Sequence, residues 1–270
     1  MKRLSLTLLL LLHAWAWGAV VHRPRLLAAG SWEPPQLGSF IIDGDDATPG
    51  EFPHQVSVQR ESSLGLIHVC GGTIVSVRFI LTAAHCVSGM SHTTVKVVAG
   101  VTDLLDPKAQ VAQAKHFIHH DSYNSITNSN DILLIKLKEE LLLGTLVQTL
   151  ALPPNGEVVG EGAICTVIGW GAITKSGGVY ETLQKVAVPV VSKESCRMSY
   201  GEAAVDYNMI CAGSSVGDAC NGDKGGPLLC SGHLHGVASW GEGCGNAFYP
   251  TVYMEVTYFR DWILKYITHN

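Results

Sequence analysis

The chain has 270 residues, of which 47% are hydrophobic and 15% are charged, and its formal net charge is −5 at pH 7. A chain of this size and apolar content can bury the core of one large globular unit. The mild negative charge excludes the strongly basic composition of a nucleic-acid-binding protein, and we expect no nucleic-acid partner. No low-complexity tract or internal repeat is visible.

The chain begins with the features of a secretory leader. Met1–Arg3 is basic, Leu4–Leu12 is apolar, and small residues between Ala14 and Ala19 offer a cleavage site. The competing interpretation is a membrane anchor, but the apolar run is too short to cross a bilayer and no other stretch is long enough. We therefore predict a signal peptide over residues 1–19, a secreted extracellular protein and no membrane association.

The segment after the leader, residues 20–40, is rich in proline, arginine and glycine, and we interpret it as an extended pro-segment. Short β-branched runs separated by turn residues follow, a spacing that indicates an all-β barrel or sandwich. The end of the chain, Tyr258–Ile267, has apolar residues at helical spacing and predicts an amphipathic helix. The predicted strands are Thr73–Val75, Phe79–Thr82, Val95–Val98, Ile132–Leu137, Ala163–Ile168, Val186–Val191, Leu234–Ser239 and Thr251–Val256.

Eight cysteines lie outside the leader, an even number that fits disulfide bonding in an oxidising compartment. Metal binding is the alternative, and it is weak because the cysteines are scattered rather than clustered in C-x-x-C pairs. Composition alone assigns no pairing.

Three segments together resemble the chymotrypsin/trypsin-like serine proteases, the S1 family. Leu81–Cys86 ends in Ala-Ala-His-Cys, Asn130–Leu137 places an aspartate before an apolar strand, and Cys220–Leu228 reads Cys-Asn-Gly-Asp-Lys-Gly-Gly-Pro-Leu. Ile41–Gly44 and Phe52–Val58 are similar to the family's mature N-terminus and first strand. The resemblance covers roughly residues 41–270 as one protease domain. It implies two antiparallel six-stranded Greek-key β-barrels, an all-β fold, with a C-terminal α-helix.

The resemblance also implies roles for the residues of the site. His85 matches the general base, Asp131 the acid that orients it, and the backbone N–H groups of Gly222 and residue 224 the oxyanion hole. Taken alone, such a histidine or aspartate more often has a structural role, and the surrounding motifs favour the catalytic one. Ser239-Trp240-Gly241 is similar to the strand that pairs with an extended substrate peptide.

An activation switch and four disulfides are further implications of the resemblance. In zymogens of this family, cleavage frees an isoleucine ammonium that pairs with a buried acid, and the matching residues are Ile41 and Asp223. The residue before that bond is Phe40, where trypsin-activated zymogens carry Arg or Lys, so cleavage by a chymotrypsin-like enzyme and no cleavage both remain open. The implied disulfides are Cys70–Cys86, Cys165–Cys230, Cys196–Cys211 and Cys220–Cys244.

Lys224 departs from the family at the position of the attacking serine. A serine acts because the histidine removes its proton and the resulting ester reacts with water. A lysine ammonium has no hydroxyl proton to give, and an acylated lysine would be an amide as stable as the original peptide bond. A Ser/Lys dyad would need a serine at the attacking position, but the nearest, Ser231 and Ser239, map elsewhere. We therefore predict an inactivated homologue that is not an enzyme.

The substrate pocket carries a second departure. Asp218 matches the acid at the base of a trypsin-type pocket, which selects Arg or Lys, and Gly241 matches one wall. The other wall matches Thr251, where relatives that accept long side chains have glycine. The side chain of Thr251 is β-branched and has little freedom to swing away, so we expect it to obstruct the pocket. A shifted backbone that leaves the pocket open is the alternative.

Other ligand sites receive little support. His116, His119 and His120 lie between a strand and a loop, where exposed histidines are more common than metal ligands. Gly100–Val111 matches the family's calcium loop but lacks a convincing set of carboxylates. No Asn-x-Ser/Thr sequon occurs. We expect no metal, no cofactor and no N-glycosylation.

The sequence thus favours a secreted, monomeric protease homologue that serves as a binding or regulatory protein in extracellular proteolytic cascades. Such a protein acts as a decoy, cofactor or inhibitor, and its expected partners are proteases, protease substrates or protease inhibitors. The alternative is a trypsin-like serine endopeptidase with residual or unusual activity. A structural or storage role has no feature in its favour.

Overall fold

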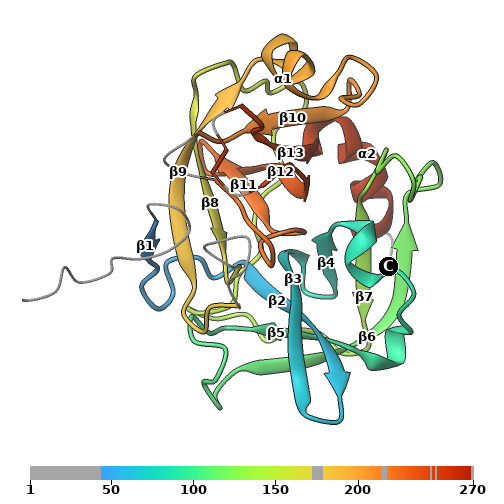
Figure 1. The fold of residues 1–270 in the computed structure, drawn as a ribbon. Helices are drawn as coiled ribbons and strands as arrows, with labels where there is room; N and C mark the ends of the chain where they lie inside the picture. Colours follow the sequence, from blue (N-terminus) through green and yellow to red (C-terminus); the bar gives the residue numbers. More distant parts are fainter. Residues whose placement is uncertain (1–43, 172–178, 215–217, 244, 247, 269–270) are drawn as a thin grey trace, which may run out of the picture. The chain divides into compact units, whose positions relative to one another are not determined.

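The computed structural model describes residues 44–171, 179–214, 218–243, 245–246 and 248–268. The predicted signal peptide, the predicted pro-segment and Ile41 lie outside the described residues, as does Cys244. All described residues belong to one compact unit that spans Gly38–Asn270. Figure 1 gives the element labels used below.

The first half of the unit is a closed antiparallel barrel. Going round it, the strand order is β2-β3-β4-β7-β6-β5. Its wall is densely apolar, and all four residues of β4 are buried. The strands are β2 (Gln55–Ser62), β3 (Gly65–Ser76), β4 (Phe79–Thr82), β5 (Val95–Ala99), β6 (Gln110–His119) and β7 (Leu133–Leu137).

The second half repeats the same plan. The sheet has the order β1-β9-β10-β13-β12-β11-β8, and the additional pairing of β9 with β8 closes six of these strands into a second barrel. The strands are β1 (Asp45–Asp46), β8 (Ile164–Gly169), β9 (Gln184–Val191), β10 (Met209–Ala212), β11 (Pro227–Cys230), β12 (His233–Trp240) and β13 (Thr251–Glu255). In both barrels the first three strands are followed round the ring by the last, the fifth and the fourth, so the predicted two-barrel fold is confirmed.

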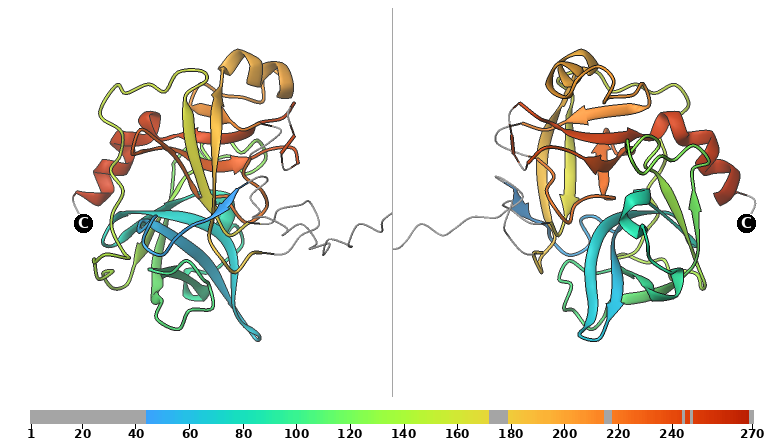
Figure 2. Two further views of the ribbon diagram at one scale, coloured as in Figure 1. Left: turned by 90° about the vertical axis from the view of Figure 1, so that its left-hand side faces the viewer. Right: turned by 45° about the vertical axis from the view of Figure 1, so that its right-hand side comes forward.

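Two α-helices and two short 3₁₀ helices complete the described elements (Figure 2). The C-terminal helix α2 (Val256–Ile267) buries Val256, Phe259 and Ile263, which share one face at helical spacing. Helix α1 (Lys193–Tyr200) is capped by the Ser192 hydroxyl and buries only Cys196. The 3₁₀ helices are η1 (Ala84–Val87) and η2 (His92–Thr94). Within the described part of the chain, no helix is both long and apolar enough to cross a bilayer.

Three described disulfides link strands to another strand or to a helix. The structure contains Cys70–Cys86, Cys165–Cys230 and Cys196–Cys211, the pairs that the resemblance implied. Cys220 is also disulfide-bonded, but its implied partner Cys244 lies outside the described residues. The first bridge ties β3 to the 3₁₀ helix that carries His85, and so helps to fix that histidine.

Candidate active site

A short buried network links the two barrels. His85 lies in η1, directly after β4, and Asp131 lies just before β7, the strand that pairs with β4. Asp131 Oδ2 lies 2.6 Å from Nδ1 of His85, and Asp131 Oδ1 accepts from the His85 backbone N–H at 2.8 Å. Ser239 of β12 donates its hydroxyl to Asp131 Oδ2 at 2.5 Å. Burial acts to raise the pKa of Asp131, but the hydrogen bonds from His85 and Ser239 prevail and lower it.

The loop that carries Lys224 is held from three sides. The carbonyl of Lys224 accepts from the Gly71 N–H at 2.8 Å, which ties this loop to β3. His68 Nε2 lies 2.9 Å from the carbonyl of Gly222, and His68 Nδ1 lies 2.7 Å from the Ser57 hydroxyl. Gly225 has a φ of 78° and packs so closely that an added Cβ would lie 2.2 Å from Thr82 Oγ1. The backbone at position 224 is therefore rigidly placed.

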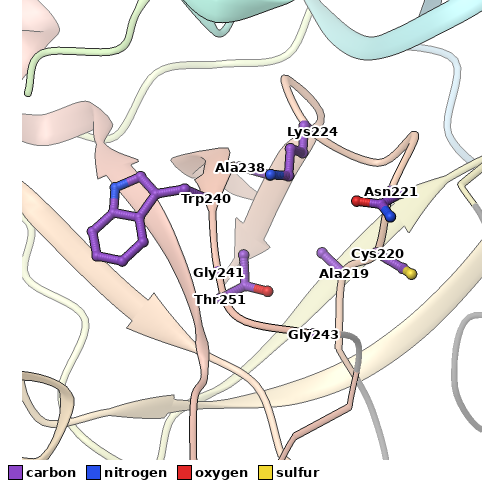
Figure 3. Close-up of a pocket in the computed structure, with 9 residues that line it drawn as sticks. All are labelled: Ala219, Cys220, Asn221, Lys224, Ala238, Trp240, Gly241, Gly243 and Thr251. Atoms are coloured by element: carbon purple, nitrogen blue, oxygen red, sulfur yellow. The ribbon is translucent and has the colours of Figure 1, made fainter. Parts of the chain in front are cut away.

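The side chain of Lys224 enters the cavity that was predicted to receive a substrate side chain. Figure 3 shows it extending from its loop into a cavity of about 240 Å³. Burial lowers the pKa of the Lys224 ammonium, and attraction to Asp131 opposes this. Among the described residues, no hydrogen bond or ion pair holds the ammonium. The cavity is lined by Ala219, Cys220, Asn221, Lys224, Ala238, Trp240, Gly241, Gly243 and Thr251.

The acid of the pocket is covered by the pocket wall. Thr251 donates its hydroxyl to Asp218 Oδ1 at 2.6 Å, and the Ala219 N–H donates to the same oxygen at 2.9 Å. Gly241 lies beside Thr251, and a Cβ added to Gly241 would meet Thr251 Oγ1 at 3.5 Å. Burial raises the pKa of Asp218 to about 6, although these hydrogen bonds act to lower it. A long cationic side chain entering the pocket would have to displace Thr251 to reach the acid.

Asp223 is a second buried acid beside the pocket. Its carboxylate accepts from the backbone N–H groups of Gly171 at 2.8 Å and Cys220 at 2.9 Å. A Cβ on Gly171 would lie 2.5 Å from the Asp223 Cγ, so only glycine leaves room for the carboxylate there. Burial raises the pKa of Asp223 to about 6. The implied pairing with Ile41 lies outside the described residues.

Other residues considered from the sequence lie away from the site. Ser231 is exposed in the turn between β11 and β12, and Ser239 is engaged with Asp131, so neither stands at the attacking position. His116 and His119 are exposed on β6, and His120 packs against Phe259 of α2. Where ligand atoms converge within the described ranges, these three histidines do not take part.

Sequence reasoning missed His68. This buried histidine bridges Ser57 of β2 to Gly222 in the next barrel, 154 residues away in the chain, and so sets the direction of the Gly222 peptide. No local motif marks it. The only available signal was a histidine in an otherwise apolar strand beside a cysteine, which is more often structural.

The arrangement can move protons but lacks a hydroxyl at position 224. The His85–Asp131 pair is placed to accept and return a proton, and His68 fixes the carbonyl of Gly222 in the loop predicted to bind an oxyanion. An uncharged amine at Lys224 could attack a carbonyl carbon, expelling the peptide amine as leaving group. The product would be an amide that water attacks slowly.

The class of chymotrypsin-like serine proteases is defined by two six-stranded barrels with a histidine–aspartate pair and a loop for the nucleophile between them. In this chain the loop is the one that carries Lys224. The trypsin family model matches residues 41–263 of this chain. Trypsin Blo t 3 of Blomia tropicalis is 39% identical over 83% of this chain and 85% of its own length. Trypsin-1 of Astacus astacus is 40% identical over 83% of this chain and 98% of its own length. Trypsin alpha of Drosophila erecta is 40% identical over 86% of this chain and 89% of its own length. The chain belongs to the trypsin family.

These comparisons correct one expectation. From Lys224 we predicted that the chain is not an enzyme, but relatives about 40% identical over most of its length are named trypsins, which points to a protease. The prediction gave one side chain more weight than the scaffold, in which the His85–Asp131 pair and the backbone of the nucleophile loop are kept.

Proposed function

We propose that this protein acts outside the cell by holding protein partners in the cleft of a trypsin-family domain, as a decoy, cofactor or inhibitor in proteolytic cascades. The partners are proteases, their substrates or their inhibitors, and the protein works as a monomer. The leader-like residues 1–19 support secretion, and so do the disulfides, which persist in oxidising compartments.

The observation that carries this proposal is the position of the Lys224 side chain. It fills part of the pocket that would receive a substrate side chain, while the strand Ser239–Gly241 and the buried Asp131 network keep the cleft in shape. A cleft of this kind can still pair with an extended peptide. A serine protease forms an ester on its serine hydroxyl and then hydrolyses it, and position 224 has no hydroxyl for this step.

The second candidate function is a trypsin-like endopeptidase of residual or unusual activity. The relatives named trypsins favour it, and so does the intact contact between His85 and Asp131. In this case the peptide bond would be cleaved slowly, without an ester intermediate on a serine.

Binding and turnover measured on the same preparation separate the two functions. The secreted protein is immobilised, partners are captured from its native fluid, and the captured partner is then titrated against wild type and His85→Ala. A binding function predicts equal affinity for both forms. If the partner is instead cleaved by wild type and left intact by His85→Ala, the endopeptidase is the correct assignment.

A further inference from the structure

A buried cluster of metal-ligating side chains lies outside the cleft. Its members are Glu157, in the segment between the barrels, and His233 and His235 at the start of β12. We expected no metal from the sequence, where the histidines considered as ligands were His116, His119 and His120. Folding brings the three side chains together from segments 76 residues apart, and their ligand atoms all lie within 4.8 Å of one another.

The spacing fits a tetrahedral ion. Glu157 Oε2 lies 3.1 Å from His233 Nδ1 and 3.5 Å from His235 Nε2. Two ligands that bind zinc at its usual bond lengths in tetrahedral geometry are separated by roughly 3.3–3.5 Å. The three atoms are shielded from solvent and lie at ion-pair distance from one another, and within the described residues none of them has a hydrogen-bond partner outside the cluster. Polar atoms buried in this way normally have a partner.

The backbone holds the three side chains in place before any ion binds. His233 and His235 both lie at the start of β12, and their ring centroids are 6.4 Å apart. Glu157 follows Gly156, whose φ is 79°, in a turn closed by a bond from the Glu157 N–H to the Pro154 carbonyl at 3.1 Å. The Leu234 N–H donates to the Ala151 carbonyl at 3.2 Å, which ties this segment to β12.

We propose that Glu157, His233 and His235 form a binding site for a divalent transition-metal ion, with zinc as the best match. Two imidazoles and one carboxylate suit zinc, whereas calcium and magnesium prefer sites built from oxygen alone. The side chain of His235 is 2% exposed, while those of Glu157 and His233 are 26% and 31% exposed, so solvent can supply a fourth ligand.

A bound ion would also connect two parts of the fold. The bound ion would clamp the segment around Glu157 onto β12, whose other end carries Ser239 of the cleft.

Zinc titration of the chelator-treated, full secreted chain tests this proposal. Calorimetry should give one zinc ion per chain, and Co²⁺ at the same site should give the visible absorption of a four-coordinate ion. His233→Ala and Glu157→Gln are both partly exposed positions, so these variants should fold and bind zinc at least tenfold more weakly. His119→Ala, an exposed histidine on the other barrel, is the control and should bind as wild type does.

Three results would overturn the site. Wild type could show no saturable zinc binding, which would leave only a cluster of charged side chains. Zinc affinity could be unchanged in both His233→Ala and Glu157→Gln, which would place the ion elsewhere. His119→Ala could lose as much affinity as either variant, which would show binding to scattered surface histidines.

Discussion

Thr251 Oγ1 donates a 2.6 Å hydrogen bond to Asp218 Oδ1, so the wall of the pocket covers the acid at its base. An acid covered in this way offers little to an incoming cation, because its nearest oxygen already has donors from Thr251 and Ala219. The pocket keeps the charge of a trypsin-type site but not the access to it.

Opening the wall should restore cation binding. Thr251→Gly removes both the bulk and the hydroxyl above Asp218, and we expect the affinity for benzamidine to rise at least tenfold, measured by calorimetry. Thr251→Val removes the hydroxyl but keeps the bulk, and it should stay as weak as wild type. If valine raised the affinity as much as glycine, the hydrogen bond rather than the bulk would be the obstruction.

Lys224→Ser and Thr251→Gly should together raise peptide hydrolysis more than Lys224→Ser alone. Lys224→Ser alone should raise the hydrolysis of Arg/Lys peptides only modestly, because Thr251 still excludes the side chain. Adding Thr251→Gly, with the bond before Ile41 cut, should raise kcat/KM by a further hundredfold or so, within the roughly million-fold range of a serine nucleophile. His85→Ala in the double variant is the control and should abolish the gain. Near-normal trypsin-like turnover by Lys224→Ser alone would contradict the account of Thr251.

The sequence predicted most strands near the site, but it did not predict how those strands pair. Phe79–Thr82 agrees with β4 at both ends, and the predicted helix Tyr258–Ile267 begins two residues late compared with α2. Helix α1 was missed because it buries only Cys196 and so has no apolar stripe in the sequence. The short strands β10 and β11 were missed as well, since four residues carry little periodicity.

Only those residues of the site that stand in recognisable sequence motifs could be predicted. The resemblance identified His85 and Asp131, which are 46 residues apart, but the bond from Thr251 to Asp218 and the direction of the Lys224 side chain depend on packing. The cluster of Glu157 with His233 and His235 was not predicted, because folding brings it together from distant segments of the chain.

The contribution of Asp218 and Asp223 to stability should fall as the pH rises from about 4 to about 7. Burial raises the pKa of both Asp218 and Asp223 to about 6, so the folded state binds their protons more tightly than the unfolded state does. The stabilisation is complete below the unfolded pKa of about 4 and is lost as the pH passes the folded pKa. Calorimetry of the uncleaved chain should show the Tm of wild type falling relative to that of Asp218→Asn over this range. Histidines whose pKa is lowered by burial, such as His54, act in the opposite direction but affect both forms alike. A Tm difference between wild type and Asp218→Asn that stays constant or rises over this range would refute the assignment.

The nucleophile loop should depend on the glycine that it packs against. A Cβ on Gly71 would lie 2.9 Å from the Gly226 Cα, a backbone atom that cannot swing aside. We expect Gly71→Ala to lower the free energy of unfolding by about 2 kcal/mol in urea titration. Gly160→Ala is the matched control, because nothing lies within 4 Å of its added Cβ. Equal stability of the two variants would show that the loop can shift freely.

We propose that Lys224 leaves the cleft able to bind partners while slowing peptide hydrolysis. The most direct measurement is the turnover of a peptide library by homogeneous wild-type protein, cut before Ile41, alongside His85→Ala and the Lys224→Ser/Thr251→Gly double variant. The account predicts a wild-type rate at least a thousandfold below that of the double variant. Repeated turnover by wild type at the rate of the double variant, lost on His85→Ala, would contradict it.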